Sequence, residues 1–304
     1  MTTSSTSARR GERVAVWVLR VLWLGLPVAS VAAFDDALDG LGGAVRWVVT
    51  IGLYAGWAAG LLATLVPSTT SLTAVRVGGP AALAAVIWAV AAGETVGVTD
   101  GVVLAWAAGT AATASAGHVA DAFVDGSSYG NERRFALRTP MAVLLGPAEM
   151  AWAAVVGGLV AGPLLLAGRQ WLAGAIALVV GVPVAWFGGL AVDQLSRRWF
   201  VFVPAGVVLH DPMTMTDPVL LRRATIVALG PVPAAADRGV DRLDLSGGAP
   251  GLVLELRVRD PVRVGLRGRG DRREVDADRI RVTPVRPGAV LAEARRTLLP
   301  HDPT

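Results

Sequence analysis

Residues 171–203 read WLAGAIALVVGVPVAWFGGLAVDQLSRRWFVFV, and this stretch decides the fold. Its first part, Trp171–Val192, is apolar throughout, and about 20 such residues are enough for a helix to cross the hydrocarbon core of a membrane. Arg197 and Arg198 follow. Trp199–Val203 is then a short apolar run that ends at a turn, which is typical of a β-strand. The sequence therefore predicts a membrane helix joined directly to a β-rich domain.

The composition of the whole chain points the same way. Apolar residues make up 53% of the chain and charged residues 17%, whereas about 25% of the residues in an ordinary soluble domain are charged. So much apolar surface excludes a disordered chain. The absence of cysteine excludes a disulfide scaffold, thiol catalysis, iron–sulfur clusters and cysteine zinc sites. Every basic residue is arginine, and residues 197–304 hold 18 of the 28, so the β-rich part is basic.

Six segments are long and apolar enough to be membrane helices. They are Val14–Phe34, Ala44–Val66, Pro80–Gly97, Gly101–Phe123, Met141–Ala167 and Trp171–Val192. The sequence thus predicts an α-helical membrane bundle of six transmembrane helices and a small C-terminal β-rich cytosolic domain. The domain boundaries that we expect are a disordered cytoplasmic tail at 1–13, a transmembrane domain at 14–193 and the β-rich domain at 194–304.

The arginines of the connections set the expected orientation, because cytoplasmic loops carry an excess of basic residues. Arginines precede the first span, occur in residues 67–79 and 118–140, and follow the last span, whereas residues 35–43 hold three aspartates and no arginine. We therefore expect a multi-pass protein of the cell membrane with both termini in the cytoplasm. A cleaved signal peptide is an alternative for the N-terminus, but Arg20 interrupts its apolar run.

Beyond residue 198 the hydrophobic period changes from that of helices to that of strands. Alternating apolar and polar residues in Leu252–Arg259 and Val262–Leu266, separated by Asp260-Pro261, predict half-buried strands, and Ala289–Leu299 has the apolar face of a helix. We expect long loops at Ala234–Gly251 and a solvated hairpin tip that contains Arg269-Gly270-Asp271. Several short strands followed by a helix have the order of elements of a pleckstrin-homology-like barrel.

Two groups of residues have the spacing of a site. Gly52, Gly56 and Gly60 form one flat helix face, which suits packing inside the bundle or a homo-oligomer. His118, Asp121 and Asp125 share a helix face and are weak candidates for a divalent metal, the alternative being a hydrated helix end. They do not match the CDP-alcohol phosphatidyltransferases, because Asp125-Gly126 lacks the Ala-Arg that this motif needs.

The longest cytoplasmic connection concentrates polar and aromatic side chains. Residues 126–134 read GSSYGNERR, and residues 197–212 read RRWFVFVPAGVVLHDP. The candidate binding residues of these stretches are Tyr129, Arg133, Arg134, Arg197 and Arg198, the alternative being that their charge only fixes topology. Together the stretches resemble uncharacterised multi-pass membrane proteins of GC-rich Gram-positive bacteria, which implies a membrane location and no particular chemistry.

Two charges lie inside the predicted spans at similar depth. Arg20 is six residues into the first span and Glu149 eight residues into the fifth, or roughly 9 Å and 12 Å at 1.5 Å per residue. A charge within a membrane helix usually faces a partner. We therefore predict an intramembrane ion pair, the alternative being that Arg20 reaches the headgroups and Glu149 is protonated or hydrated.

No set of residues has the pattern of a catalytic site, and we expect no cofactor and no nucleic-acid partner. The leading hypothesis is a non-enzymatic scaffold or regulatory protein that presents a cytosolic β-domain to other membrane or cytosolic proteins, or to anionic lipid of the bilayer. A transporter or channel is the first alternative. A membrane-embedded lipid-processing enzyme that uses His118, Asp121 and Asp125 is the second.

Overall fold

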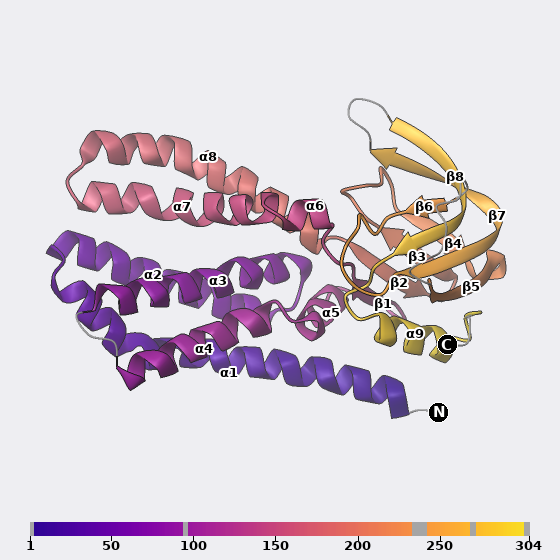
Figure 1. Cartoon of the computed structure of the whole chain (residues 1–304), viewed down its shortest axis with the longest axis horizontal. Helices are drawn as coiled ribbons and strands as arrows, with labels where there is room; N and C mark the ends of the chain where they lie inside the picture. Colours follow the sequence, from indigo (N-terminus) through magenta and orange to yellow (C-terminus); the bar gives the residue numbers. More distant parts are fainter. Residues whose placement is uncertain (1–2, 94–96, 233–241, 268–271, 301–304) are drawn as a thin grey trace. The chain divides into compact units, whose positions relative to one another are not determined.

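The computed structural model describes residues 3–93, 97–232, 242–267 and 272–300 (Figure 1). The chain divides into two compact units. The helical unit consists of Val14–Val119 and Ala148–Asp193. The β-rich unit consists of Met1–Arg13, Ala120–Pro147 and Gln194–Thr304, so it is assembled from three separate parts of the sequence.

The helical unit contains helices that are long and apolar enough to cross a membrane. Among the described residues five helices qualify alone, and a sixth span results if α4 and α5, which are bent by 49°, are counted together. The helices with residues in this unit are α1 (Thr3–Asp39), α2 (Gly43–Leu65), α3 (Thr69–Ala92), α4 (Val98–Ala114), α5 (Gly117–Asp125), α7 (Pro147–Ala167) and α8 (Trp171–Ser196).

Several of the expected helix boundaries differ from those of the structure. Helix α3 begins eleven residues before the expected Pro80, because the Ser68 side chain caps it by accepting a hydrogen bond from the Ser71 amide at 3.1 Å. Arg76 therefore lies in a helix and not in a connection. The expected fourth span is broken between Ala114 and Gly117, where α4 and α5 are bent by 49°. The expected fifth span is divided at Gly146, whose φ of +126° no helix accommodates.

Tryptophans hold α1 against its neighbours. The Trp23 indole donates to the carbonyl of Trp57 at 2.9 Å, and the Trp57 indole donates to the carbonyl of Trp23 at 2.9 Å. The ring of Trp23 lies against Gly60 of α2, where a Cβ atom would overlap it. Trp106 of α4 donates to Leu22 of α1 at 2.8 Å. These contacts bury the polar indole N–H groups with partners, as an apolar surrounding requires.

The described residues of the β-rich unit form two four-stranded sheets. The first has the order β1-β2-β3-β4, with every pair antiparallel. The second has the order β5-β7-β8-β6, in which only β6 and β8 are parallel. The strands are β1 (Arg133–Ala136), β2 (Trp199–Val203), β3 (Gly206–His210), β4 (Val219–Arg222), β5 (Ile226–Pro231), β6 (Arg242–Asp244), β7 (Leu254–Arg267) and β8 (Arg272–Val282).

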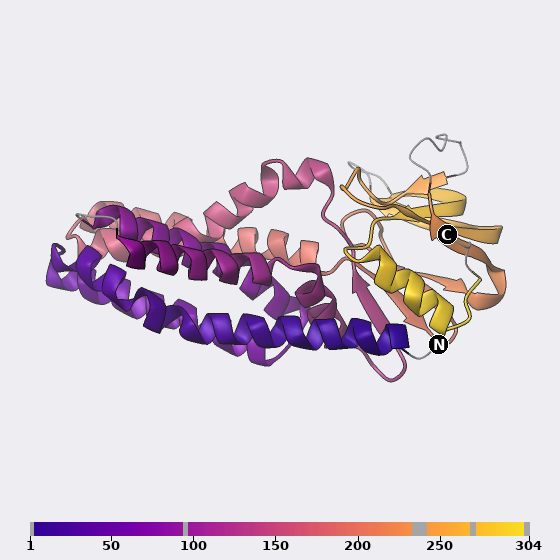
Figure 2. The ribbon, with the colours of Figure 1, turned by 60° about the horizontal axis from the view of Figure 1, so that its bottom comes forward.

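One hydrophobic core joins the two sheets and the last helix. Phe200 and Leu209 of the first sheet belong to the same buried cluster as Leu254 and Ile280 of the second. Helix α9 (Pro287–Arg296), which Figure 2 shows beside the strands, adds Val290 to this cluster. The remaining elements of the unit are the short helix α6 (Met141–Leu144) and a 3₁₀ turn at Arg223–Thr225. The expectation of a β-rich unit with a C-terminal helix is confirmed.

Details of this unit depart from the sequence-based expectations. Residues 3–13, for which we expected disorder, belong to helix α1. Arg133 and Arg134, expected in a loop, lie in strand β1. Asp260-Pro261 does not end a strand, because β7 continues through it with a shift in register before Val262. Strand β6 lies within the expected loop 234–251, and Arg269-Gly270-Asp271 falls outside the described residues.

Candidate functional site

A cluster of five charged side chains lies inside the β-rich unit. Arg133 of β1 forms ion pairs with Glu12 of α1 and with Asp125 of α5. Arg286, which precedes α9, binds the same Glu12 at 2.7 Å and lies 3.4 Å from Asp121. Glu12, Asp121 and Arg133 are at most 5% exposed. The cluster therefore joins three regions that are far apart in the sequence, around Glu12, Asp121–Arg133 and Arg286.

Asp121 is the most deeply buried member of this cluster. One carboxylate oxygen accepts a hydrogen bond from the Ala136 amide at 3.0 Å. Burial raises the pKa of Asp121 to about 7, although this hydrogen bond and the charge of Arg286 act in the opposite direction. Asp121 belongs to the β-rich unit, outside the apolar helices. When Asp121 holds its proton, two carboxylates face two guanidinium groups, so the cluster is electrically balanced.

A second buried ion pair joins Arg198 to Asp211. Both side chains are 1% exposed, and the guanidinium binds both carboxylate oxygens at 2.8 Å. Arg198 also donates to the carbonyls of Arg138 and Leu245. Asp211 accepts a hydrogen bond from the Thr214 hydroxyl at 2.7 Å. Each charged atom has partners, as a buried ion pair requires, and this pair fixes the end of β3 to the start of β2.

These contacts assign a structural role to several candidate residues. Arg133 and Arg198, which we expected to bind a ligand, are buried in ion pairs within the protein. Asp121 and Asp125 face arginines, which would repel a cation. The described part of the chain contains no group of three or more histidine, aspartate or glutamate side chains that could hold a metal ion.

Arg134, Trp199 and His210 form an aromatic and basic stack on the first sheet. It lies on the face opposite to the one from which Phe200 and Phe202 enter the core. The guanidinium carbon of Arg134 lies 5.6 Å from the centre of the Trp199 ring. Trp199 stacks on the His210 imidazole with ring centres 4.5 Å apart and planes inclined by 12°. The Nδ1 atom of His210 lies 2.8 Å from the carbonyl oxygen of Arg197. Arg134 also pairs with Glu132 at 3.0 Å.

The other candidate residues have separate locations. Tyr129 is 86% exposed, and Arg197 is exposed. Arg20 donates to the carbonyl of Thr64 in α2 at 3.0 Å and lies over the ring of Trp17. The ion pair between Arg20 and Glu149 stays a prediction.

Of the three glycines on one face of α2, one lies against a neighbouring helix. A Cβ atom at Gly60 would overlap Trp23 of α1, whereas Gly52 and Gly56 have no side-chain or neighbouring backbone atom within 4 Å of that position. Gly60 therefore serves packing within the bundle. The other two glycines leave an open surface, and nothing on it indicates a partner.

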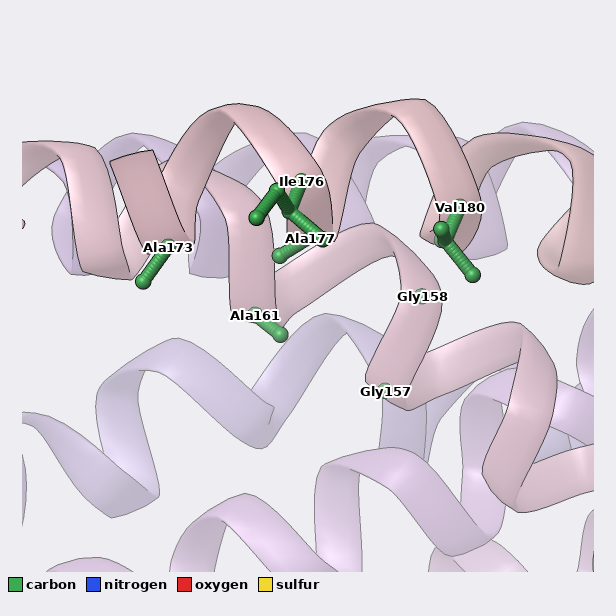
Figure 3. Close-up of a pocket in the computed structure, with 8 residues that line it drawn as sticks. Gly157, Gly158, Ala161, Ala173, Ile176, Ala177 and Val180 are labelled. Carbon is green, nitrogen blue, oxygen red and sulfur yellow. The ribbon is translucent and has the colours of Figure 1, made fainter. Parts of the chain in front are cut away.

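A groove of about 500 Å³ lies between α7 and α8 (Figure 3). Its lining consists of glycine, alanine, isoleucine and valine, and the backbones of Gly158 and Gly181 lie so close that a Cβ atom on either would overlap the other. No charged or hydrogen-bonding side chain lines it. The groove therefore offers no groups for catalysis or for binding an ion.

Comparison of the chain with family models, curated proteins and solved structures gives no match. Glu12, Arg286 and Asp211 complete the buried ion pairs and are not among the residues predicted from the sequence. For Asp211 a local signal exists, because an Asp three residues before a Thr at the end of a strand is a common turn former. Glu12 and Arg286 lie 274 residues apart, and no local pattern relates them.

Proposed function

We propose that this chain is a multi-pass protein of the cell membrane, with both termini in the cytoplasm, and that its β-rich unit serves as a non-enzymatic interaction module. Helices α1, α2, α3, α7 and α8 have the length and apolar composition of spans. The charge pattern supports the orientation, because arginines occur before α1, in residues 118–140 and directly after α8. With α4 as a further span, α5 marks the return of the chain to the β-rich unit.

The observation that carries the proposal of a non-enzymatic role is the internal neutralisation of the buried charges. In a catalytic site, charged groups with shifted pKa values usually face a cleft. In this protein Arg133 and Arg198 instead bind carboxylates of their own unit. The Asp121 carboxylate, which has the raised pKa, is 0% exposed and accepts a hydrogen bond from the Ala136 backbone amide. These groups hold the β-rich unit together, which leaves its exposed faces for partners.

Two further expectations remain proposals. The pleckstrin-homology-like barrel is supported by two antiparallel-rich sheets that share a core with α9. A regulatory or scaffold role suits such a barrel, although fold alone assigns no function. The transporter or channel alternative is less well supported, because the groove between α7 and α8 is apolar and Arg20 is bound to a backbone carbonyl.

The orientation is tested with reporter fusions to the full chain. A reporter after Thr304 should be active only in its cytosolic form, and one inserted after Gly40 only in its exported form. The chain should also stay with the membrane in alkaline extraction. Release by alkali, or an exported signal from Thr304, would contradict the proposal.

The interaction role is tested in cells by photo-crosslinking. A photoreactive amino acid replaces Tyr129, which is 86% exposed in the β-rich unit, and should give a discrete protein adduct. Val28, which is 80% exposed within α1, is the matched control and should react with lipid only. Equal adduct patterns at both positions would remove the support for an interaction module.

A further inference from the structure

The first sheet has an apolar outer face, although one face of an antiparallel sheet is usually polar and solvated. Side chains alternate between faces, and Phe200, Phe202 and Leu209 point into the core. The register then places Arg134, Val201, Val208 and Leu220 in one row across the opposite face. Trp199 and His210 form the adjacent row. We call these residues together with Arg222 the outer face of the first sheet.

The outer face carries positive charge at both edges. Arg134 stands on β1, and Arg222, which is exposed, stands on β4. Leu220, beside Arg222 on the same strand face, is 46% exposed. Glu132 is the acidic side chain bound to this group, through Arg134, and it offsets part of the charge. Val201, in the middle of the row, is buried, so the accessible groups of this face are Leu220, the half-buried Trp199 and Val208, and the two arginines at its edges.

The sequence neighbourhood of this face indicates what it binds. Helix α8 ends at Ser196 and β2 begins at Trp199, so Trp199 follows the end of a proposed span within about 10 Å, at ~3.3 Å per residue. Tryptophan is enriched at the membrane–water interface, and arginine binds phosphate oxygens in pairs. The Trp199–His210 stack with Arg134 above it joins both kinds of group in one place.

We propose that the outer face of the first sheet docks on anionic phospholipid headgroups of the leaflet at which α8 ends. Arg134 and Arg222 bind headgroup phosphates, while Trp199 and Leu220 contact the apolar boundary below them. This inference rests on the proposed membrane location of α8. The headgroup site also gives a role to strand β1, which lies between α5 and α6 in the sequence. This strand supplies Arg134 to the first sheet.

The test uses the full chain in a neutral detergent, because the β-rich unit is assembled from three parts of the sequence. Binding of short-chain phosphatidylglycerol and phosphatidylcholine is measured by native mass spectrometry. Wild type should retain phosphatidylglycerol in preference. A basic residue near an anionic leaflet is worth about 1 kcal/mol, which corresponds to roughly five-fold in affinity. The double variant R134Q/R222Q should therefore bind phosphatidylglycerol about 25-fold more weakly, with phosphatidylcholine binding unchanged.

Two further variants make the result specific. R222Q alone, at an exposed strand end, should lose about five-fold without a change in melting temperature. R295Q removes one exposed arginine from α9, outside the outer face, and should bind both lipids as wild type does. Equal losses in R222Q and R295Q, or an unchanged preference in R134Q/R222Q, would overturn the headgroup site.

Alkaline extraction of the same proteins separates this proposal from the proposed function. If wild type leaves the membrane in alkali, the membrane location itself is wrong. If it stays in the membrane but shows no preference for phosphatidylglycerol, the headgroup site is wrong and the membrane location stands.

Discussion

Replacing Asp211 by asparagine should destabilise the β-rich unit strongly. Asparagine keeps the size of the side chain and can still accept a hydrogen bond from Thr214, but it leaves the Arg198 guanidinium without its counter-charge. Both side chains are 1% exposed, and removing one partner of a buried ion pair costs about 3–5 kcal/mol. Native domains are stable by only about 5–15 kcal/mol, so this loss is a large share of the total.

The assay is thermal unfolding of the full chain in detergent, followed by limited proteolysis of the β-rich unit. A domain of 150–250 residues loses roughly 2–4 °C in Tm for each kcal/mol, so D211N should melt about 6–20 °C lower than wild type. The matched control is E274Q, which breaks the ion pair with Arg263. Those side chains are 65% and 70% exposed, so the control should cost at most about 1 kcal/mol.

The double variant R198M/D211N decides whether the stranded charge is the cause. Methionine removes the uncompensated guanidinium, so the double variant should lose less stability than the sum of the two single variants. The reasoning would be refuted if D211N lost no more Tm than E274Q does. It would also be refuted if the loss in R198M/D211N equalled the sum of the losses in R198M and D211N.

Three further outcomes are expected in the same detergent. G60L should lower Tm, because its side chain would overlap Trp23, and overpacking costs about 1–3 kcal/mol; G56L, at an open position, should leave Tm unchanged. L298G should raise Tm by about 2–4 °C, because Leu298 has a φ of +54° and is 84% exposed, and the left-handed conformation costs a residue with a side chain about 1 kcal/mol. For Asp121 the pKa is raised from 3.8 to about 7 on folding, so the folded state binds more protons between these values and stability falls as pH rises through them. The Tm of D121N relative to wild type should therefore increase from pH 4 to pH 7 and then level off, and a difference that is independent of pH would contradict the raised pKa.

The apolar helices and several strands could be predicted from sequence because their signals are local. Trp171–Val192 is continuous apolar chain, and α8 forms there. Trp199–Val203 and Val262–Leu266 have the pattern of strands, and β2 and β7 include them. The helix at Ala289–Leu299 shows its apolar face in its spacing, and α9 places Val290 in the core. In each case the nearest neighbours in the sequence carry enough of the burial energy to determine the element.

Helix ends were harder to predict, since a few local groups outweigh hydrophobicity there. Hydropathy alone placed the third span at Pro80, but the Ser68 cap starts α3 earlier. The left-handed Gly146 divides the expected fifth span in the same way. A sliding average of hydropathy does not register a single cap or a single positive φ.

The sequence by itself determined the class of this protein: apolar helices joined to a basic, β-rich part with a final helix. Only the tertiary structure decided which segments of the chain make up that β-rich part. Glu12, Arg133 and Arg286 meet in one buried cluster, and β1 pairs with β2 across more than sixty residues of chain. The sequence beside a predicted span does not show whether an arginine there faces water or a carboxylate from a distant part of the chain. Its role depends on which segments exclude water around it, because only burial turns a surface charge into a group that must be paired.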